Sequence, residues 1–417
     1  MKKIILLLIY LSFSGLLFSQ ITEKEENRTD ALKLFIECTD CDIEFIKREV
    51  TYVNYVRDPK EAQVHVLVSY QYSGSGGKEY KLFFTGQKDY TGMNDTIIFA
   101  TNVNNTTDEI RTDFLHSLQV GLIRYVAKTN LIKDISIKYD APTSTSEVKD
   151  KWNSWVFNLG SNAWGEAEKS IRSTSVNSYL TINRVTEKWK YEIYAGHNYN
   201  EKRFEITSDS TSSILFSYNK SLYSSVLIVK SLTNQWSTGI NVGSNYSTFS
   251  NIKLGYFIYP AIEYNIFPYS ESSRKQLTFR YTTGYKHNDY MDTTIYNKLN
   301  EKLFSESLGI AYKTIQKWGN INIYISGQHY FHDFSKNSLN TSVSAEIRIV
   351  KGLSFNIYGS YSFIRNQLSL PKSGANQQDV LLKQKELATN FNYYFSFGLS
   401  YTFGSIYNNV VNPRFNN

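Results

Sequence analysis

Long apolar runs are what this sequence of 417 residues lacks most. After the first 20 residues, no stretch approaches the roughly 20 apolar residues that a membrane-spanning helix needs, so the sequence predicts no such helix. Proline, which breaks regular structure, is scarce as well, with only 6 residues, and there are only 3 Met. Basic residues are not clustered despite a formal net charge of +7. We therefore expect no nucleic-acid partner.

The longest run of apolar residues lies at the N-terminus. Lys2 and Lys3 precede the apolar run Ile4 to Tyr10, and small residues lead to Phe18-Ser19-Gln20. A charged start, a short apolar run and a small residue at a polar junction are typical of a secretory signal. No Cys follows closely, so no lipid anchor is expected. Residues 1–20 are predicted to be a signal peptide, and residues 21–30 a flexible lead-in.

Aromatic residues are abundant, with 33 Tyr and 25 Phe. In the stretch from Phe391 to Phe403, every odd position is Phe, Tyr or Leu, and the even positions are mostly small or polar. Side chains of a strand alternate between its two faces. The aromatic face would pack against a second layer in a soluble sandwich, or face lipid in a transmembrane barrel. A negative mean hydropathy fits the barrel too, because every second residue faces a polar lumen.

The pattern of apolar residues in 31–138 predicts a small α+β domain. We expect strands at Leu32 to Ile36, Gln63 to Tyr72, Lys78 to Gln87 and Thr96 to Ala100, and a helix at Asp42 to Val50. Ser73 to Gly77 is expected to be a hairpin turn. Thr106 and Glu109 form a capping-box pattern before a second helix, whose apolar stripe is Ile110, Phe114, Leu118, Leu122 and Tyr125. Residues 139–151 are predicted to be a linker.

Residues 152–403 predict about twelve antiparallel strands, within a range of 10 to 14, and an even number is expected of a bacterial barrel. The expected segments are Trp155 to Leu159, Val176 to Ile182, Trp189 to Ala195, Val226 to Val229, Trp236 to Val242, Ile252 to Tyr264, Leu277 to Tyr285, Leu308 to Tyr312, Ile321 to Gly327, Val343 to Ile349, Leu353 to Phe363 and the terminal strand. We expect the terminal strand to close the barrel against the strand that begins near Trp155. Residues 404–417 would be a periplasmic tail.

Two regularities favour lipid over a sandwich core. Short connections, such as Gln316-Lys317 and Lys351-Gly352, alternate with long polar stretches at Asn198 to Ser213, Lys286 to Lys302 and Asn366 to Thr389. Short periplasmic turns and long outer loops are expected of a barrel. A Trp also follows three of the short turns, and these residues predict an interfacial girdle: Trp189, Trp236 and Trp318.

The terminal strand carries a resemblance. Ser396, Gly398, Tyr401 and Phe403 have the spacing of the C-terminal assembly signal of outer-membrane barrel proteins. The resemblance implies recognition by the barrel-assembly machinery, although this chain continues for fourteen residues beyond Phe403. The whole arrangement resembles uncharacterised outer-membrane β-barrel proteins of Bacteroidota-type bacteria.

Cys38 and Cys41 lie between a predicted strand and a predicted helix, where a redox pair would also lie. Glu37, Asp40 and Asp42 surround the thiols with negative charge, which opposes thiol reactivity. A structural disulfide is therefore favoured over a redox pair or part of a metal site, and we predict no metal and no cofactor.

Charged residues of both signs fall on the predicted inner face of the barrel, where they would line water or pair to plug the lumen. These lumen-lining candidates are Lys190, Glu192, Lys253, Glu263, Arg280, Lys313, Glu346 and Arg348. Gln377 to Leu387 could add a short helix folded into the mouth. The histidines and serines form no defensible catalytic pair, so we expect no enzyme.

The sequence thus predicts an outer-membrane β-barrel preceded by a small α+β domain in the periplasm. The favoured function is a porin-like channel or uptake component for small polar or anionic solutes. The alternative is a membrane-anchored scaffold whose N-terminal domain docks a periplasmic or cell-wall partner, and an outer-membrane hydrolase ranks last. The expected partners are outer-membrane lipid and the assembly machinery.

Overall fold

The computed structural model describes residues 30–73, 76–136, 150–208, 211–374, 384–409 and 414. The predicted signal peptide, residues 21–29 of the lead-in and most of the predicted linker lie outside the described residues. So do two residues of the Ser73 to Gly77 turn and most of the tail beyond residue 409.

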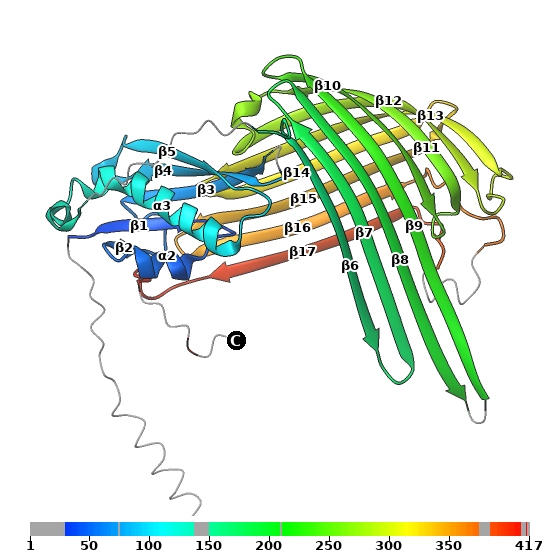
Figure 1. The fold of residues 1–417 in the computed structure, drawn as a ribbon, viewed down its shortest axis with the longest axis horizontal. Helices are drawn as coiled ribbons and strands as arrows, with labels where there is room; N and C mark the ends of the chain where they lie inside the picture. The colour runs from blue at the N-terminus through cyan, green and yellow to red at the C-terminus, as the bar shows by residue number, and fades with distance from the viewer. Residues whose placement is uncertain are drawn as a thin grey trace, which may run out of the picture.

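A small α+β unit forms the N-terminal part of the molecule (Figure 1). Its five-stranded sheet has the order β2-β1-β3-β4-β5, and β1 is parallel to both of its neighbours. All four strands and both helices expected here are present, and β2 is an addition. The elements are β1 (Leu32–Glu37), α2 (Ile43–Glu49), β2 (Val53–Tyr55), β3 (Val64–Tyr72), β4 (Lys78–Gly86), β5 (Asn94–Ala100) and α3 (Thr107–Val126), with 3-10 turns η2 (Lys88–Tyr90) and η3 (Asn130–Asp134).

Helix α3 begins as its sequence predicts. The Thr106 side chain accepts from the Glu109 amide, while the Glu109 carboxylate accepts from the Thr106 amide, which completes the capping box. The expected stripe is buried from Phe114 to Tyr125 against the sheet. Among the described residues, no helix has both the length and the apolar composition needed to cross a bilayer.

Twelve antiparallel strands form the second sheet, in sequence order from β6 to β17. Eleven of the twelve predicted segments lie within one observed strand each, and the terminal segment, Phe391 to Phe403, extends beyond the end of β17 at Tyr401. The strands are β6 (Trp155–Ala167), β7 (Ile171–Val185), β8 (Trp189–Ser208), β9 (Thr211–Ser231), β10 (Trp236–Ser247), β11 (Ile252–Asn265), β12 (Lys275–Tyr290), β13 (Asn300–Gln316), β14 (Gly319–Tyr330), β15 (Asp333–Val350), β16 (Leu353–Ile364) and β17 (Phe391–Tyr401), with η4 (Tyr269–Glu271) between β11 and β12. The fold is therefore mainly β, a large barrel-like antiparallel sheet preceded by a small α+β unit.

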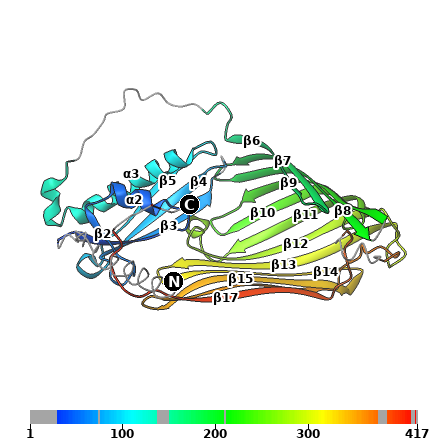
Figure 2. The same ribbon diagram turned by 90° about the horizontal axis from the view of Figure 1, so that it is seen from below.

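The sheet curves but its two edges do not meet, contrary to the expected closure (Figures 1 and 2). Among the described residues, β6 and β17 are the end strands and share no ladder. Closure requires the first and last strands to meet at a fixed stagger. Here β6 to β9 diverge from β17, and most of β17 is exposed on both faces.

The expected alternation of short and long connections is also wrong. We call the end where β6 begins and β17 ends proximal, and the other end distal. Most proximal turns are short, as expected, but the distal connections at 168–170, 248–251 and 331–332 are short as well. Residues 198–208, predicted to be loop, extend β8 instead. The connection between β16 and β17, at 365–390, is the longest, and those at 266–274 on the proximal side and 291–299 on the distal side are of intermediate length.

Candidate functional site

The concave face of the large sheet encloses a cavity of about 570 Å³ near its proximal end. Residues from strands β7 to β12 line this cavity. Strand pairing places five of them on the same face of the sheet, which we call the inner face: Lys190, Leu227, Asn241, Glu263 and Arg280.

Strand register extends this inner face across the other strands. Seven of the eight lumen-lining candidates fall on it, because their positions alternate in step with the cavity residues. Lys253 is the exception, since it occupies an irregularity between Ile252 and Leu254.

Ion pairs neutralise much of the charge around the cavity. Arg280 lies 2.6 Å from Glu263, whose carboxylate also accepts from the Tyr269 hydroxyl at 2.8 Å. Lys190 lies 2.7 Å from Glu192. The sequence interpretation missed Tyr269, because it lies in η4 outside the alternating segments.

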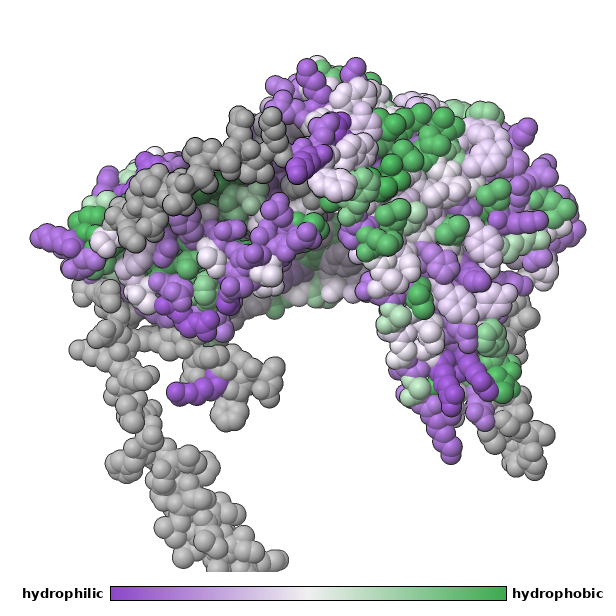
Figure 3. All heavy atoms as spheres, in the orientation of Figure 1, coloured by the Kyte–Doolittle hydropathy of each residue, from purple (hydrophilic) through white to green (hydrophobic). Residues whose placement is uncertain are grey.

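The opposite face of the sheet is apolar and exposed. On β17 it carries Phe395, Phe397 and Leu399, with exposed fractions of 64%, 70% and 70%. Figure 3 shows hydrophobic side chains gathered on the visible outer surface of the sheet, with hydrophilic ones at its ends and at the tips of the long hairpins. An exposed apolar surface of this extent marks a contact with lipid or protein.

The predicted girdle tryptophans lie at the proximal end of this surface. Trp189 and Trp236 begin β8 and β10, and Trp318 directly precedes β14. The prediction missed Trp155, which begins β6 and lies 6.0 Å from the Tyr191 ring, itself 5.8 Å from Trp189. Trp155 could have been found from the sequence, because it also stands at the first position of a predicted strand after a polar segment.

The N-terminal unit covers part of the proximal opening. Helices α2 and α3 cover one face of its sheet, yet His65, Leu67 and Ser69 on the other face are only 1%, 4% and 4% exposed. The large sheet provides the cover, because the Arg274 guanidinium lies 4.7 Å from the Phe83 ring and that of Arg348 lies 5.4 Å from Phe35.

Glu37 is the main polar link between the two parts. Its carboxylate lies 2.8 Å from Arg348 Nη1 on β15 and 3.0 Å from His65 Nε2 on β3. Burial acts to raise the pKa of Glu37, but the hydrogen bonds from His65 and Arg348 outweigh it and hold the pKa below its usual 4.5. The ion pair of Lys351 with Glu61, at 2.5 Å, is a second link.

The C-terminal tail provides a third link. Tyr407 pairs with Val56 in an antiparallel bridge, and the Asn408 amide donates to the Tyr55 carbonyl at 2.9 Å. The Asn409 side chain accepts from the Tyr55 amide at 2.6 Å. The segment after β17 thus extends the edge of the N-terminal sheet at β2.

The distal opening is narrowed by the chain that follows β16. Leu368 is buried against Leu303 and Tyr330 in a small apolar cluster. Asn251 donates to the carbonyls of Asp292 and Ser369, both at 2.9 Å, which fixes this segment to the neighbouring loops. Most of the predicted Gln377 to Leu387 helix lies outside the described residues, and its described end, residues 384–387, is not helical.

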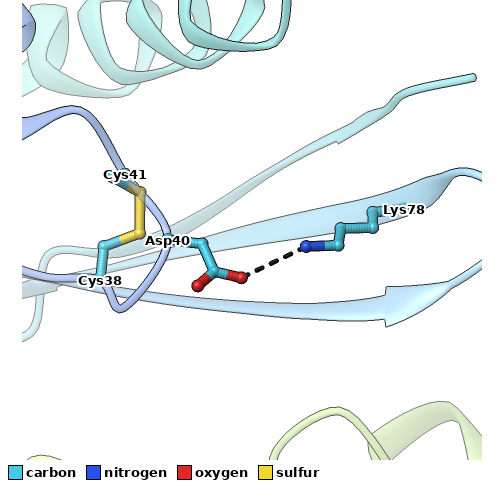
Figure 4. The surroundings of a disulfide bond; sticks show 4 residues. All are labelled: Cys38, Asp40, Cys41 and Lys78. Carbon is cyan, nitrogen blue, oxygen red and sulfur yellow. Dashed lines mark hydrogen bonds and ion pairs between the residues drawn. A yellow bond between two sulfur atoms is a disulfide. The ribbon is translucent and has the colours of Figure 1, made fainter. Parts of the chain in front are cut away.

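Cys38 and Cys41 form a disulfide beside the end of β1 (Figure 4). Asp40 between them lies 3.2 Å from the Lys78 amine on β4. In the described part of the chain, no group of three or more His, Cys, Asp or Glu residues is arranged to hold a metal ion.

The four residues of the predicted assembly signal divide between the two faces of the terminal strand. Ser396 and Gly398 pair with Tyr358 and Asn356, while Tyr401 and Phe403 are 64% and 79% exposed. Phe403 lies beyond the end of β17.

These features define a class, a barrel-like antiparallel sheet with a polar inner face, an apolar outer face and an attached α+β unit. No protein-family model and no curated protein sequence matches the chain. Among solved structures, the chain is similar to the NanC porin in its rhombohedral crystal form. The identity is 12% and the TM-score 0.28, and the match covers 59% of this chain and 99% of the porin chain. At these values the similarity carries no argument about this chain.

Proposed function

We propose that the protein is an outer-membrane channel or uptake component for small polar solutes, with its N-terminal unit in the periplasm. The observation that carries the proposal is the polar cavity of about 570 Å³ on the concave face of a sheet whose convex face is apolar. A sheet with these two faces suits lipid outside and water inside.

The preference for anions that the sequence favoured rests on five basic against three acidic candidates. Lys190, Arg280 and Arg348 each pair with a carboxylate, so three of the five basic charges are balanced. We therefore propose at most weak anion selectivity. Because the proximal opening is covered and the distal opening is narrowed, we propose that the structure represents the closed form of the channel.

Single-channel recording in planar bilayers tests this function. Unitary currents are expected, together with heat-modifiable gel migration of the folded sheet. In the variant Arg280→Gln, the reversal potential in a salt gradient should shift towards cation selectivity, because Glu263 loses its ion-pair partner and the cavity gains a net negative charge. Lys298→Gln in the distal loop is the control and should leave it unchanged. A correctly inserted protein that never conducts would remove the channel proposal.

The scaffold function remains the second candidate, and one observation favours it. β5 is the end strand of the N-terminal sheet, and Ile98 on it is 56% exposed. A periplasmic or cell-wall partner would use this strand, because the helices cover one face of the N-terminal sheet and the large sheet leaves alternate residues of β5 exposed on the other face. Retention of an envelope component by the wild-type chain, but not by Ile98→Lys, would support it.

A further inference from the structure

A second cavity, of about 360 Å³, lies between the N-terminal unit and the proximal rim of the large sheet. The segment after β2 forms one side, with Arg57 and Lys60. The turns at 317–318 and 351–352 form the other side. This crevice is separate from the inner cavity, since the two share no lining residue.

The crevice is strongly basic. Five basic residues line it, and Asp58 is its single acidic residue. Arg348 and Lys351 are held by Glu37 and Glu61. Within the described ranges, no carboxylate lies within ion-pair distance of the three remaining basic residues, which are Arg57, Lys60 and Lys317.

Arg274 is a further cation close to Lys317. Partial burial and the nearby Arg274 guanidinium both hold the pKa of Lys317 below its usual value. Arg274 Nε is itself buried without a hydrogen-bond partner among the described residues. Lys317 and Arg274 repel each other, and an anion bound beside Lys317 would reduce this repulsion.

Apolar residues line part of the rest of the crevice. Trp318 and Val350 are 45% and 53% exposed, and Leu353, which pairs with Tyr401 of β17, lies on the outer face of the sheet. A fully water-soluble anion would gain nothing from these walls. A molecule with an anionic head and an apolar tail would use both parts of the site.

We propose that this crevice binds the phosphate headgroup of an anionic phospholipid, whose acyl chains lie along the outer face of β14 to β17. The proposal rests on the proposed membrane location of the sheet. Arg57 and Lys60 belong to the N-terminal unit and Lys317 to the large sheet, so the bound lipid joins the two parts.

Native mass spectrometry of the full-length protein in neutral detergent tests this site. The probes are phosphatidylglycerol, phosphatidylcholine and inorganic phosphate. The wild-type chain should retain phosphatidylglycerol in clear preference to phosphatidylcholine. In Arg57→Gln, Lys317→Gln, the preference should fall by about tenfold or more, since each cation near an anionic headgroup is worth roughly a fivefold effect. Lys188→Gln, in another proximal turn, should retain the wild-type preference.

Three results would overturn the proposal. The first is equal retention of the two lipids by the wild-type protein, and the second is an unchanged preference in the double variant. The third is displacement of phosphatidylglycerol by inorganic phosphate, which would make the crevice a site for a soluble anion. Heat-modifiable migration of every variant shows that the sheet is folded. If the wild-type chain fails to insert into phosphatidylcholine vesicles, the membrane location fails, whereas insertion without lipid preference removes only this site.

Discussion

At the scale of single residues, Glu37 carries the contact between the two parts of the molecule. It ends β1, so backbone geometry fixes its position, and its carboxylate is shared between Arg348 of the large sheet and His65 of its own sheet. His65 is only 1% exposed. Removal of the Glu37 carboxylate would therefore leave the buried imidazole ring without this hydrogen-bond partner.

Glu37→Gln should therefore loosen the N-terminal unit from the large sheet. The expected loss is about 1.5–3 kcal/mol, the usual range for hydrogen bonds to a charged group. Hydrogen exchange of β1 and β3 amides in the full-length protein measures it. Glu49→Gln, at the exposed end of α2, is the matched control, and equal effects of the two variants would contradict the assigned role.

The same contact should depend on pH. Because the folded-state pKa of Glu37 lies below 4.5, its stabilisation is fully present above the unfolded pKa and is lost as the pH falls through the folded pKa. The difference in exchange protection between the wild-type protein and Glu37→Gln should be constant from about pH 7 to 5 and vanish at lower pH. A difference that persists at about pH 2 would show that the carboxylate charge is not its source.

At the scale of secondary-structure elements, α3 approaches β4 most closely at Gly121. A methyl group added there would meet the Phe84 ring at 2.1 Å, and Phe84 is 1% exposed, so the ring has little room to move. The glycine is thus required for the packing of helix on sheet.

Gly121→Ala should destabilise the N-terminal unit by about 1–3 kcal/mol through overpacking, despite the higher helix propensity of alanine. Exchange rates of the α3 amides provide the measurement. Val120→Ala, on the exposed side of the same turn, should change them little. A stabilised Gly121→Ala variant would mean that the helix can shift away from Phe84 at low cost.

The alternation of apolar and polar residues identified every strand of the large sheet, but it placed few of the strand ends correctly. The stretch of β8 from Asn198 to Arg203 is polar on both faces, so it shows no hydrophobic period of two even though it is a strand. Hydrophobic alternation reports where one face meets an apolar medium, and strands continue beyond that region. Alternation also placed the charged candidates on one face, but the partners of Arg280 and Arg348 depend on register and docking, which one sequence does not contain.

The cover of the proximal opening did leave a signal in the sequence. Val64 to Val68 and Leu82 to Phe84 are apolar or aromatic on both faces apart from His65, a pattern typical of strands buried on both sides. The two predicted helices could cover only one of those faces, so the other face required a second cover. The pairing of the tail with β2 left no comparable signal, because β2 has three residues and its partner lies outside any alternating segment.

At the scale of the whole molecule, opening of the proximal end of the proposed channel would require the N-terminal unit to move, and the contact of the tail with β2 would resist that movement. Asn408→Pro removes the amide that donates to Tyr55 and should raise the fraction of time that single channels spend open. Asn392→Ala, at the distal end of β17, is the control. Unchanged opening in Asn408→Pro would show that the tail does not hold the cover in place.

The bridge between the tail and β2 also sets an order of events during biogenesis. Tyr55 and Asn409 are 354 positions apart, so β2 is synthesised long before its partner exists. Until then its edge is an unpaired template for other chains. The attachment can form only after residues 407–409 have been synthesised, so it follows the synthesis of every strand of the large sheet.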